Sequence, residues 1–285
     1  MGDVVIVDSV RTGLAKSFRG SFNLTRSDDM VAHCIDSLLE RNAKVAGDEV
    51  EDVVVGAASH VGEQDGNLAR LAVALSKHLS LTAASGLTIN RFCSSGLQSI
   101  AIAANQIASG QTQVAMAGGV DSISMRNRQK PAKAELNPRL LEEVPDIFMA
   151  MGNTAEVVAR RYQVTREMQD EYSLQSQQRY AAAVDAGKMA EEIVPMNATM
   201  LKVDKETGEE SRVDVVVDKD ECNRPQTTLE GLAGLPPAFE EDGSVTAGNA
   251  SQLSDGASMT LLMSAERAAQ LGIEPMGIYR GFTVA

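Results

Sequence analysis

The 285-residue sequence contains no tryptophan, only 4% aromatic residues and only three cysteines. With so few large rings, the core must be built mainly from aliphatic side chains. The cysteines, Cys34, Cys93 and Cys222, are odd in number and widely spaced. They therefore match neither a disulfide framework nor the paired spacing of a metal site. This usage is typical of a reducing compartment, and we expect a cytoplasmic protein.

Long apolar runs and an excess of positive charge are also missing. No stretch approaches about 18 uninterrupted apolar residues, so no membrane span is predicted. The N-terminal sequence MGDVVIVDSVRTG has no basic region followed by a long apolar run, and it predicts a first strand rather than a signal peptide. The net charge of −13 disfavours nucleic acid or an anionic membrane as a partner.

The common nucleotide and metal motifs are absent. The sequence has no GxGxxG, P-loop, HExxH, CxxC or GxSxG, so NAD, nucleoside triphosphate and metal sites have no support. The only histidines are His33, His60 and His78. We expect His33 and His78 to be packing or surface residues. His60 follows a predicted strand and therefore faces the end of the sheet where ligands bind, which keeps it as a minor candidate.

Predicted strands and helices alternate along much of the chain. Apolar runs predict buried strands at 4–7, 53–55, 87–89, 113–117 and 259–263. Helices are predicted at 27–46, 67–79, from about 97 onward, and at 265–271. Ser27 is expected to cap the first helix, and Leu68, Leu71, Ala72 and Leu75 to face inward in the second. This alternation predicts an α/β fold with a mostly parallel sheet.

The middle of the chain has a different texture. Residues 124–145 are predicted to be irregular, with helices at 153–162 and from Thr165 to about 186, and a β-ribbon at 193–217. We expect a core domain at 1–122 and 244–271, an inserted loop subdomain at 123–243, and the start of a further domain at 272–285. The final sequence IYRGFTVA is predicted to be a buried strand.

Cys93 is the best candidate nucleophile. It lies in the sequence LTINRFCSSGLQSIAIAANQIASG, which predicts a buried strand, a tight turn and a buried apolar helix. Unpaired N–H groups and the positive end of the helix dipole at such a turn stabilise a thiolate. The alternative is an inert buried cysteine, which is the common fate of a free cysteine. The local pattern alone leaves both open.

Five longer motifs point to a known family. They are INRFCSSGLQSIA, AGGVDSISM, MGNTAEVVA, RPQTTLEGLAGLPPAF and DGSVTAGNASQLSDGAS. Together they resemble the thiolases, the acetyl-CoA acyltransferases, in colinear order from residue 4 to residue 285. Asp121 stands where the family has Glu. SSGLQ and RPQTTLEGL are more similar to the degradative 3-ketoacyl-CoA thiolases than to the biosynthetic acetoacetyl-CoA enzymes, and Ala150 stands where the latter commonly have His.

The resemblance implies a fold and a reaction. The fold is the N-terminal half of a five-layered αβαβα architecture, with an inserted subdomain that holds coenzyme A. The reaction is thiolytic cleavage of a 3-ketoacyl-CoA by coenzyme A, or the reverse condensation, through an acyl group on Cys93. The family resemblance further implies a place in fatty acid β-oxidation, coenzyme A as a substrate, no tightly bound cofactor, and a homodimer or homotetramer.

The resemblance also implies binding residues. Arg224 would contact the nucleotide end of coenzyme A, Ser251 the pantetheine and Met151 the acyl chain, with Ala247 and Asn249 on the same small-residue loop as Ser251. Taken alone, Arg224 fits either an ordinary surface residue or a phosphate contact.

The family's second half supplies an asparagine, a histidine and a second cysteine, and no histidine follows residue 78 here. We therefore expect a truncated thiolase with little or no activity by itself. Three alternatives stay open. These are a biosynthetic acetoacetyl-CoA thiolase, a related 3-ketoacyl synthase, and a non-catalytic half-thiolase that binds acyl-CoA or a partner. The coenzyme A insertion and the TAGNAS sequence disfavour the synthase.

Overall fold

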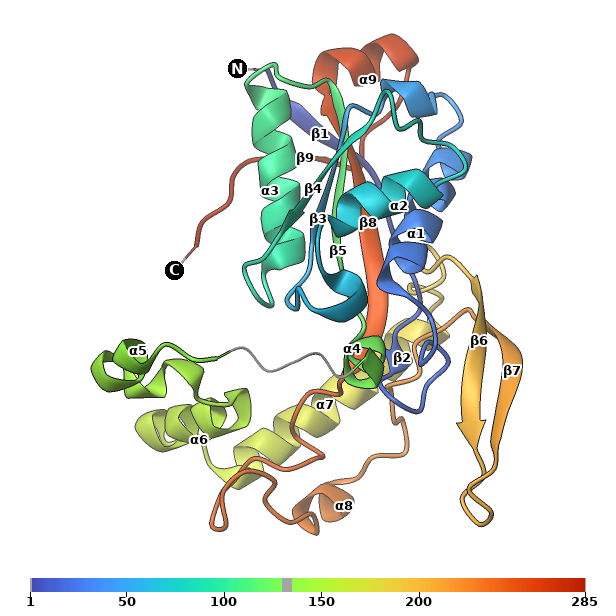
Figure 1. Ribbon diagram of the computed structural model, residues 1–285. Coiled ribbons are helices and arrows are strands. Elements are labelled where there is room, and N and C mark those ends of the chain that lie inside the picture. The colour runs from blue at the N-terminus through green and yellow to red at the C-terminus, as the bar shows by residue number, and fades with distance from the viewer. Residues whose placement is uncertain (1, 130–134, 285) are drawn as a thin grey trace. The chain divides into compact units, whose positions relative to one another are not determined.

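The computed structural model describes residues 2–129 and 135–284 (Figure 1). The chain forms two compact units. The first comprises residues 1–131, 189–221 and 253–285, and the second comprises 132–188 and 222–252. The ribbon predicted at 193–217 therefore lies in the unit of the sheet, although we had assigned it to the inserted subdomain. Which residues form a coenzyme A-binding subdomain stays a prediction.

The first unit is built on a mixed sheet. In the described residues its strand order is β4 (Ser85–Ile89), β3 (Asp52–Gly56), β5 (Val114–Asp121), β8 (Ser254–Ser264), β1 (Val4–Arg11) and β9 (Gly277–Ile278), and β2 (Ala15–Lys16) pairs with β8. Strand β3 runs parallel to β4 and β5, whereas β8 is antiparallel to both β5 and β1. Strands β4, β3, β5 and β1 thus point the same way, which confirms the predicted α/β class.

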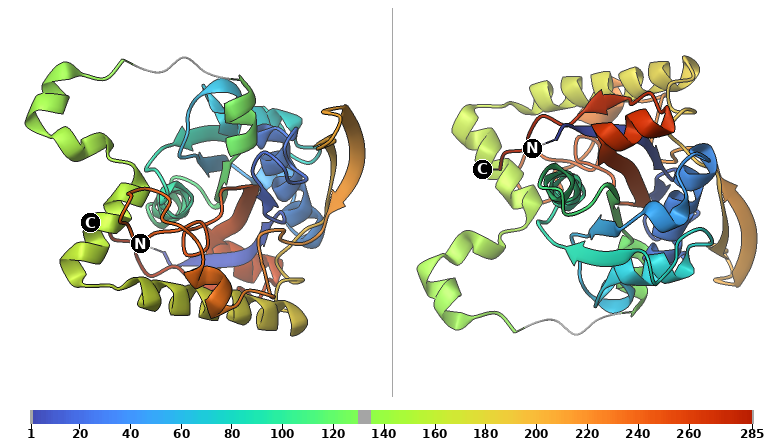
Figure 2. Two further views of the ribbon diagram at one scale, coloured as in Figure 1. Left: turned by 90° about the horizontal axis from the view of Figure 1, so that it is seen from below. Right: turned by 90° about the horizontal axis from the view of Figure 1, so that it is seen from above.

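Helices cover both faces of this sheet (Figure 2). Helix α3 (Ser95–Ala108) packs on one face, and α1 (Ser27–Arg41), α2 (Leu68–Leu75) and α9 (Ala265–Leu271) contribute to the core on the other. Alternate residues of β3 enter the two cores: Val53 and Val55 face α1, and Val54 faces α3. A strand buried on both faces has a continuous apolar sequence, so these central strands could be predicted.

Several predicted details of this unit are wrong. Ser27 does not cap α1, since its hydroxyl donates to Glu63 Oε1 at 2.8 Å. Helix α2 has only two turns, and it buries Leu68 and Ala72 but leaves Leu71 and Leu75 exposed. The short 3-10 helices η1 (Gly47–Glu49) and η2 (Gly62–Gln64) lie in the connections.

The burial of β4 and α3 and the pairing of the final segment also differ from what the sequence predicts. Strand β4 is an edge strand with partly exposed side chains rather than a buried strand. Helix α3 is not buried all round, because Leu97 is 59% exposed while Ala103 and Ala104 pack on the sheet. The final apolar segment pairs with β1 through β9 and through the Tyr279 N–H, which donates to Val4 O at 2.9 Å, and its remaining described residues form no strand.

The predicted ribbon is confirmed as β6 (Met196–Val203) and β7 (Glu210–Val217), an antiparallel pair. Its attachment to the rest of the first unit uses the Asn23 side chain, which donates to Leu201 O and accepts from Leu201 N, both at 2.9 Å. This buried amide therefore pairs with the backbone of β6 as a neighbouring strand would.

The second unit is mainly helical. It contains α5 (Pro138–Glu143), η3 (Pro145–Phe148), α6 (Met151–Tyr162), α7 (Arg166–Asp185) and α8 (Leu229–Ala233). Thr165 caps α7 as predicted, accepting from Met168 N at 3.3 Å. The segment predicted to be irregular contains α5 and, in the first unit, α4 (Ile123–Gln129), and part of it, 130–134, lies outside the described residues. None of the described helices combines the length and the apolar character needed to cross a membrane.

Candidate active site

The turn between β4 and α3 carries Cys93 on the surface of the first unit. Cys93 is exposed and directly precedes Ser94, the N-cap residue of α3. The inert buried alternative is therefore wrong for Cys93, but it describes Cys34, which is fully buried. Because the first N–H groups of a helix have no intrahelical acceptor, the sulfur lies at an end of α3 that favours negative charge.

The turn depends on a strained residue. Phe92 has φ +47°, a left-handed conformation that costs a non-glycine residue about 1–3 kcal/mol. Its ring is 75% exposed, so packing does not hold it there. Instead its N–H donates to Asn90 Oδ1 at 2.7 Å, and its carbonyl accepts from both the N–H and the hydroxyl of Ser95, at 3.0 and 2.6 Å. The sequence suggested a tight turn but not that Phe92 would be its strained residue.

Two glycines, Gly56 and Gly119, let the first turn of α3 lie against the ends of β3 and β5. A Cβ on Gly56 would collide with the backbone of Ser95, and one on Gly119 would come within 3.0 Å of the Gly96 Cα. The Ser99 hydroxyl then donates to Gly118 O at 2.6 Å. Cys93 is thus placed by backbone-to-backbone contact, which any side chain at these glycines would disturb.

A cleft of about 300 Å³ opens beside Cys93. Its lining comes from the ends of β1, β3, β5 and β8 and from the start of α3, and consists of Arg11, Leu14, Gly56, Cys93, Ser95, Gly96, Gly119, Val120, Asp121, Gly256, Ala257 and Ser258. Small residues dominate, so a ligand can approach the backbone closely. The cleft is small enough to hold a thioester or 3-keto group rather than a whole coenzyme A.

Among the described residues that line the cleft, the one basic side chain, Arg11, is already paired. Arg11 forms ion pairs with Glu192 at 2.8 Å and Asp220 at 2.6 Å. Burial by itself lowers the pKa of Arg11, but the hydrogen bonds to Asp220 and Glu192 outweigh it and raise the pKa above its usual value. Arg11 is therefore fixed in its charged form as a structural tie between β1 and the residues flanking the ribbon.

No histidine is found among the residues that line this cleft in the described part of the chain. His60 follows β3, where it was expected, and its Nε2 lies 3.2 Å from Ile89 O. A role for it stays a prediction. His78 is on the surface, with Nε2 3.3 Å from Glu40.

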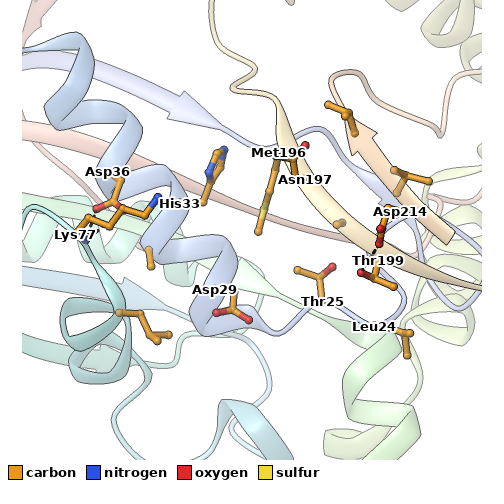
Figure 3. Close-up of a pocket in the computed structure, with 15 residues that line it drawn as sticks. Leu24, Thr25, Asp29, His33, Asp36, Lys77, Met196, Asn197, Thr199 and Asp214 are labelled. Carbon is orange, nitrogen blue, oxygen red and sulfur yellow. Dashed lines mark hydrogen bonds between the residues drawn. The ribbon is translucent and has the colours of Figure 1, made fainter. Parts of the chain in front are cut away.

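A larger pocket of about 780 Å³ lies elsewhere in the first unit, between α1, the end of α2 and the ribbon (Figure 3). Two of its acidic groups already have partners: Asp36 accepts from Ser76 and from Lys77 N, and Asp214 accepts from Thr199. The buried Nε2 of His33 has no hydrogen-bond partner within the part of the chain that the structure describes, and burial lowers the pKa of this imidazole. The described residues that line this pocket include no cysteine, so it is less suited to acyl transfer through a thioester than the Cys93 cleft.

The five predicted coenzyme A contacts all belong to the second unit. Arg224 Nη2 donates to Gln252 Oε1 at 3.2 Å, beside the exposed Ser251. Met151, the first residue of α6, is 71% exposed, and Ala247 is also exposed. Asn249, in contrast, is half-buried. The roles of all five stay predictions.

Asn249 organises the loop at 244–249. Its Nδ2 donates to Asp170 Oδ1 and to Ser244 O, both at 3.0 Å, and its Oδ1 accepts from Thr246 N at 2.7 Å. These bonds occupy its amide group. The structure therefore supports a loop-holding function for this side chain.

Sequence reasoning missed Glu156, which anchors the same loop from α6. Its buried carboxylate accepts from Ser244 N, the Ser244 hydroxyl and Val245 N at 2.7–3.0 Å. Burial raises the pKa of Glu156, but these hydrogen bonds outweigh it, and the net pKa is lowered. A carboxylate that accepts backbone N–H bonds has no local sequence signature, so no pattern could have found it.

We expect Gly56→Ala to disturb Cys93 directly. The new methyl group must push the start of α3 off β3, which should cost about 1–3 kcal/mol of stability and slow Cys93 alkylation. Gly277→Ala is the matched control, because a Cβ there meets nothing within 4 Å. Denaturant unfolding and iodoacetamide labelling check this. Equal behaviour of the two variants would refute the close-contact explanation.

We also expect Glu156 to contribute pH-dependent stability. Since its folded-state pKa is lowered, the contribution is present above the unfolded-state value and is lost as the pH falls through the folded-state value. Glu156→Gln should therefore reduce the loss of stability on acidification. Thermal melts of parent and variant from pH 7 down to pH 3 measure it, and parallel pH curves would contradict it.

Two comparisons with known proteins agree with this geometry. The model of the thiolase N-terminal domain family matches residues 4–266. The whole chain is also 42% identical, over 287 residues, to a protein of Bacillus subtilis (strain 168) named 3-ketoacyl-CoA thiolase, and the match covers 71% of that relative. The match includes the strand–turn–helix unit that presents Cys93, and on these two findings the chain belongs to the thiolase family.

Proposed function

We propose that the chain supplies the acyl-accepting cysteine for thiolytic cleavage of a 3-ketoacyl-CoA. The observation that carries the proposal is the exposed Cys93 at the start of α3, beside a cleft lined largely by small residues. Membership of the thiolase family supports an acyltransferase, and the printed name of the relative supports this substrate class.

The reaction has two steps that both use the Cys93 sulfur. The thiolate attacks the C3 carbonyl carbon of the 3-ketoacyl-CoA, and the C2–C3 bond breaks. Its electron pair remains on the acetyl-CoA fragment, which takes up a proton and leaves, while the acyl group stays on Sγ as a thioester. The thiolate of a second coenzyme A then attacks that thioester and releases the shortened acyl-CoA and the Cys93 thiolate.

Backbone donors can stabilise the negative charge that develops on the carbonyl oxygen. The start of α3 presents N–H groups beside the cleft, and donors fixed before the reaction lower the barrier most. Coenzyme A enters as a substrate, and no resident cofactor is part of the proposal.

Proton transfer is the step of the reaction that the described residues of this cleft support least. The described residues that line the cleft include no histidine to act as a base. We therefore propose that the chain by itself becomes acylated more readily than it turns over. The alternative that an experiment must exclude is a chain that binds acyl-CoA without catalysis.

Further parts of the proposal concern binding and biology. A polar contact with coenzyme A is supported by three neighbouring side chains of the second unit, Arg224, Ser251 and Gln252. Met151, Ala247 and Asn249 belong to the same unit. A role in β-oxidation, a cytoplasmic location and a homodimer or homotetramer are proposed from family membership.

Alkylation of the three cysteines tests the proposal. Iodoacetamide near pH 8 should modify Cys93 quickly, and acetoacetyl-CoA should protect it. Burial raises the pKa of Cys34 to about 12, so Cys34 should stay unmodified in the folded protein. Peptide mass mapping after a timed quench measures each site.

Two variants serve as controls. Cys93→Ser should remove the protected modification, and Cys222→Ser should leave it unchanged. Slow or unprotected labelling of Cys93 in the parent would contradict the proposed acyl transfer. A thiolysis assay with acetoacetyl-CoA separately tests turnover. A rate near that of a full-length thiolase would contradict our proposal that the chain by itself becomes acylated more readily than it turns over.

A further inference from the structure

The peptide groups of Ala58 connect two side chains that lie at the ends of different strands. Its N–H donates to Asp121 Oδ2 at 2.9 Å, and its carbonyl accepts from Asn90 Nδ2 at 3.1 Å. Asp121 ends β5, Ala58 follows β3, and Asn90 follows β4. The three carboxyl ends of these parallel strands are therefore joined by one line of hydrogen bonds.

This line of hydrogen bonds extends to the turn between β4 and α3 that carries Cys93. The Asn90 amide donates to Ala58 and, through its Oδ1, accepts from the N–H of Phe92 at 2.7 Å. Phe92 is the left-handed residue directly before Cys93. Because Asn90 itself is exposed, its orientation depends on these hydrogen bonds more than on packing.

The other end of the line is anchored in the core. Gln64 is 1% exposed and donates to Asp121 Oδ1 at 3.0 Å. Its Oε1 accepts from Ser122 N at 2.8 Å, and its Nε2 also donates to Ser59 O at 2.7 Å. Gln64 therefore presents a donor to Asp121, because turning its amide over would lose the bonds to Ser122 N and Ser59 O.

We propose that Asp121 is a positioning residue for Cys93, acting through Ala58 and Asn90 on the backbone of Phe92. The inference rests on the proposed role of Cys93 as nucleophile. Both Asp121 oxygens accept from donors whose positions are fixed, which a carboxylate satisfies and an amide does not. Asp121 also lines the cleft, and the position of the Cys93 sulfur depends on it.

A purely electrostatic role for Asp121 predicts the opposite result. Removing a negative charge near a thiol favours the thiolate and moves its reactivity to lower pH. Loosening the turn instead lets the sulfur drift from the N–H groups of α3 and moves its reactivity to higher pH. The direction of the change therefore distinguishes positioning from charge.

The test is the pH dependence of iodoacetamide alkylation at Cys93 in the whole chain. Asp121→Asn and Asn90→Ala should each slow alkylation at neutral pH about tenfold and raise its pH midpoint by about one unit. The double variant should be no slower than about the slower single variant, because both changes break the same line. Asp121→Glu keeps two acceptor oxygens and should recover most of the rate.

Asp65→Asn is the matched control. It makes the same change of charge at a carboxylate that accepts from its neighbour Gly66 N at 2.7 Å, and alkylation should be unchanged. Thermal melts of every variant confirm that the fold is kept. If Asp121→Asn does not fold, Asn90→Ala alone decides, since the proposal requires the same upward shift from this exposed residue.

An unchanged or lowered pH midpoint in Asp121→Asn would overturn the inference, as would rate losses that multiply in the double variant. Both results leave a reactive, acetoacetyl-CoA-protected Cys93 in the parent and so leave the proposed function standing. A parent Cys93 that is unreactive would instead count against the proposed function itself.

Discussion

The left-handed backbone of Phe92 ties the fold of the first unit to its chemistry. An exposed aromatic residue has no packing reason to adopt this conformation, and each of its peptide groups is held by a hydrogen bond. Such strain persists only where the surrounding structure over-determines it. Here Asn90 and Ser95 hold the residue from the two sides, and the result is a turn that leaves the Cys93 sulfur at the start of α3. The position of the Cys93 sulfur is thus set by the backbone of the neighbouring residues as much as by its own side chain.

The sheet supplies the rest of that constraint. Parallel strands β3, β4 and β5 end at one edge, so Ala58, Asn90 and Asp121 come within hydrogen-bond distance although they are far apart in the sequence. Glycines at 56 and 119 remove the side chains that would keep α3 away from those ends. In open α/β sheets, ligands commonly bind outside the carboxyl ends of the strands, and the Cys93 cleft follows this rule. The fold and the proposed site therefore share one set of contacts.

The sequence predicted those features whose cause is local. Central strands have continuous apolar runs, α7 has a Thr165 cap, and Cys93 lies between a strand and a helix, so each could be recognised within about ten residues. Features that depend on distant contacts could not be recognised. The apolar pattern places Leu71 in the core, whereas α2 buries a face made of Leu68, Ala69, Ala72 and Val73. The sequence predicts a capping role for Ser27 because its partner, Glu63, lies in another segment. Asp121 was noted only as a departure from the family's glutamate, since its contact with Ala58 exists only in the folded chain.

The central claim is that Cys93 accepts the acyl group. The most direct measurement is the intact mass of the protein after mixing with acetoacetyl-CoA, followed by peptide mapping. Our account predicts one added acetyl group located on Cys93, its removal by free coenzyme A, and none of this in Cys93→Ser. An unmodified protein, or an acetyl group on another residue, would contradict the account.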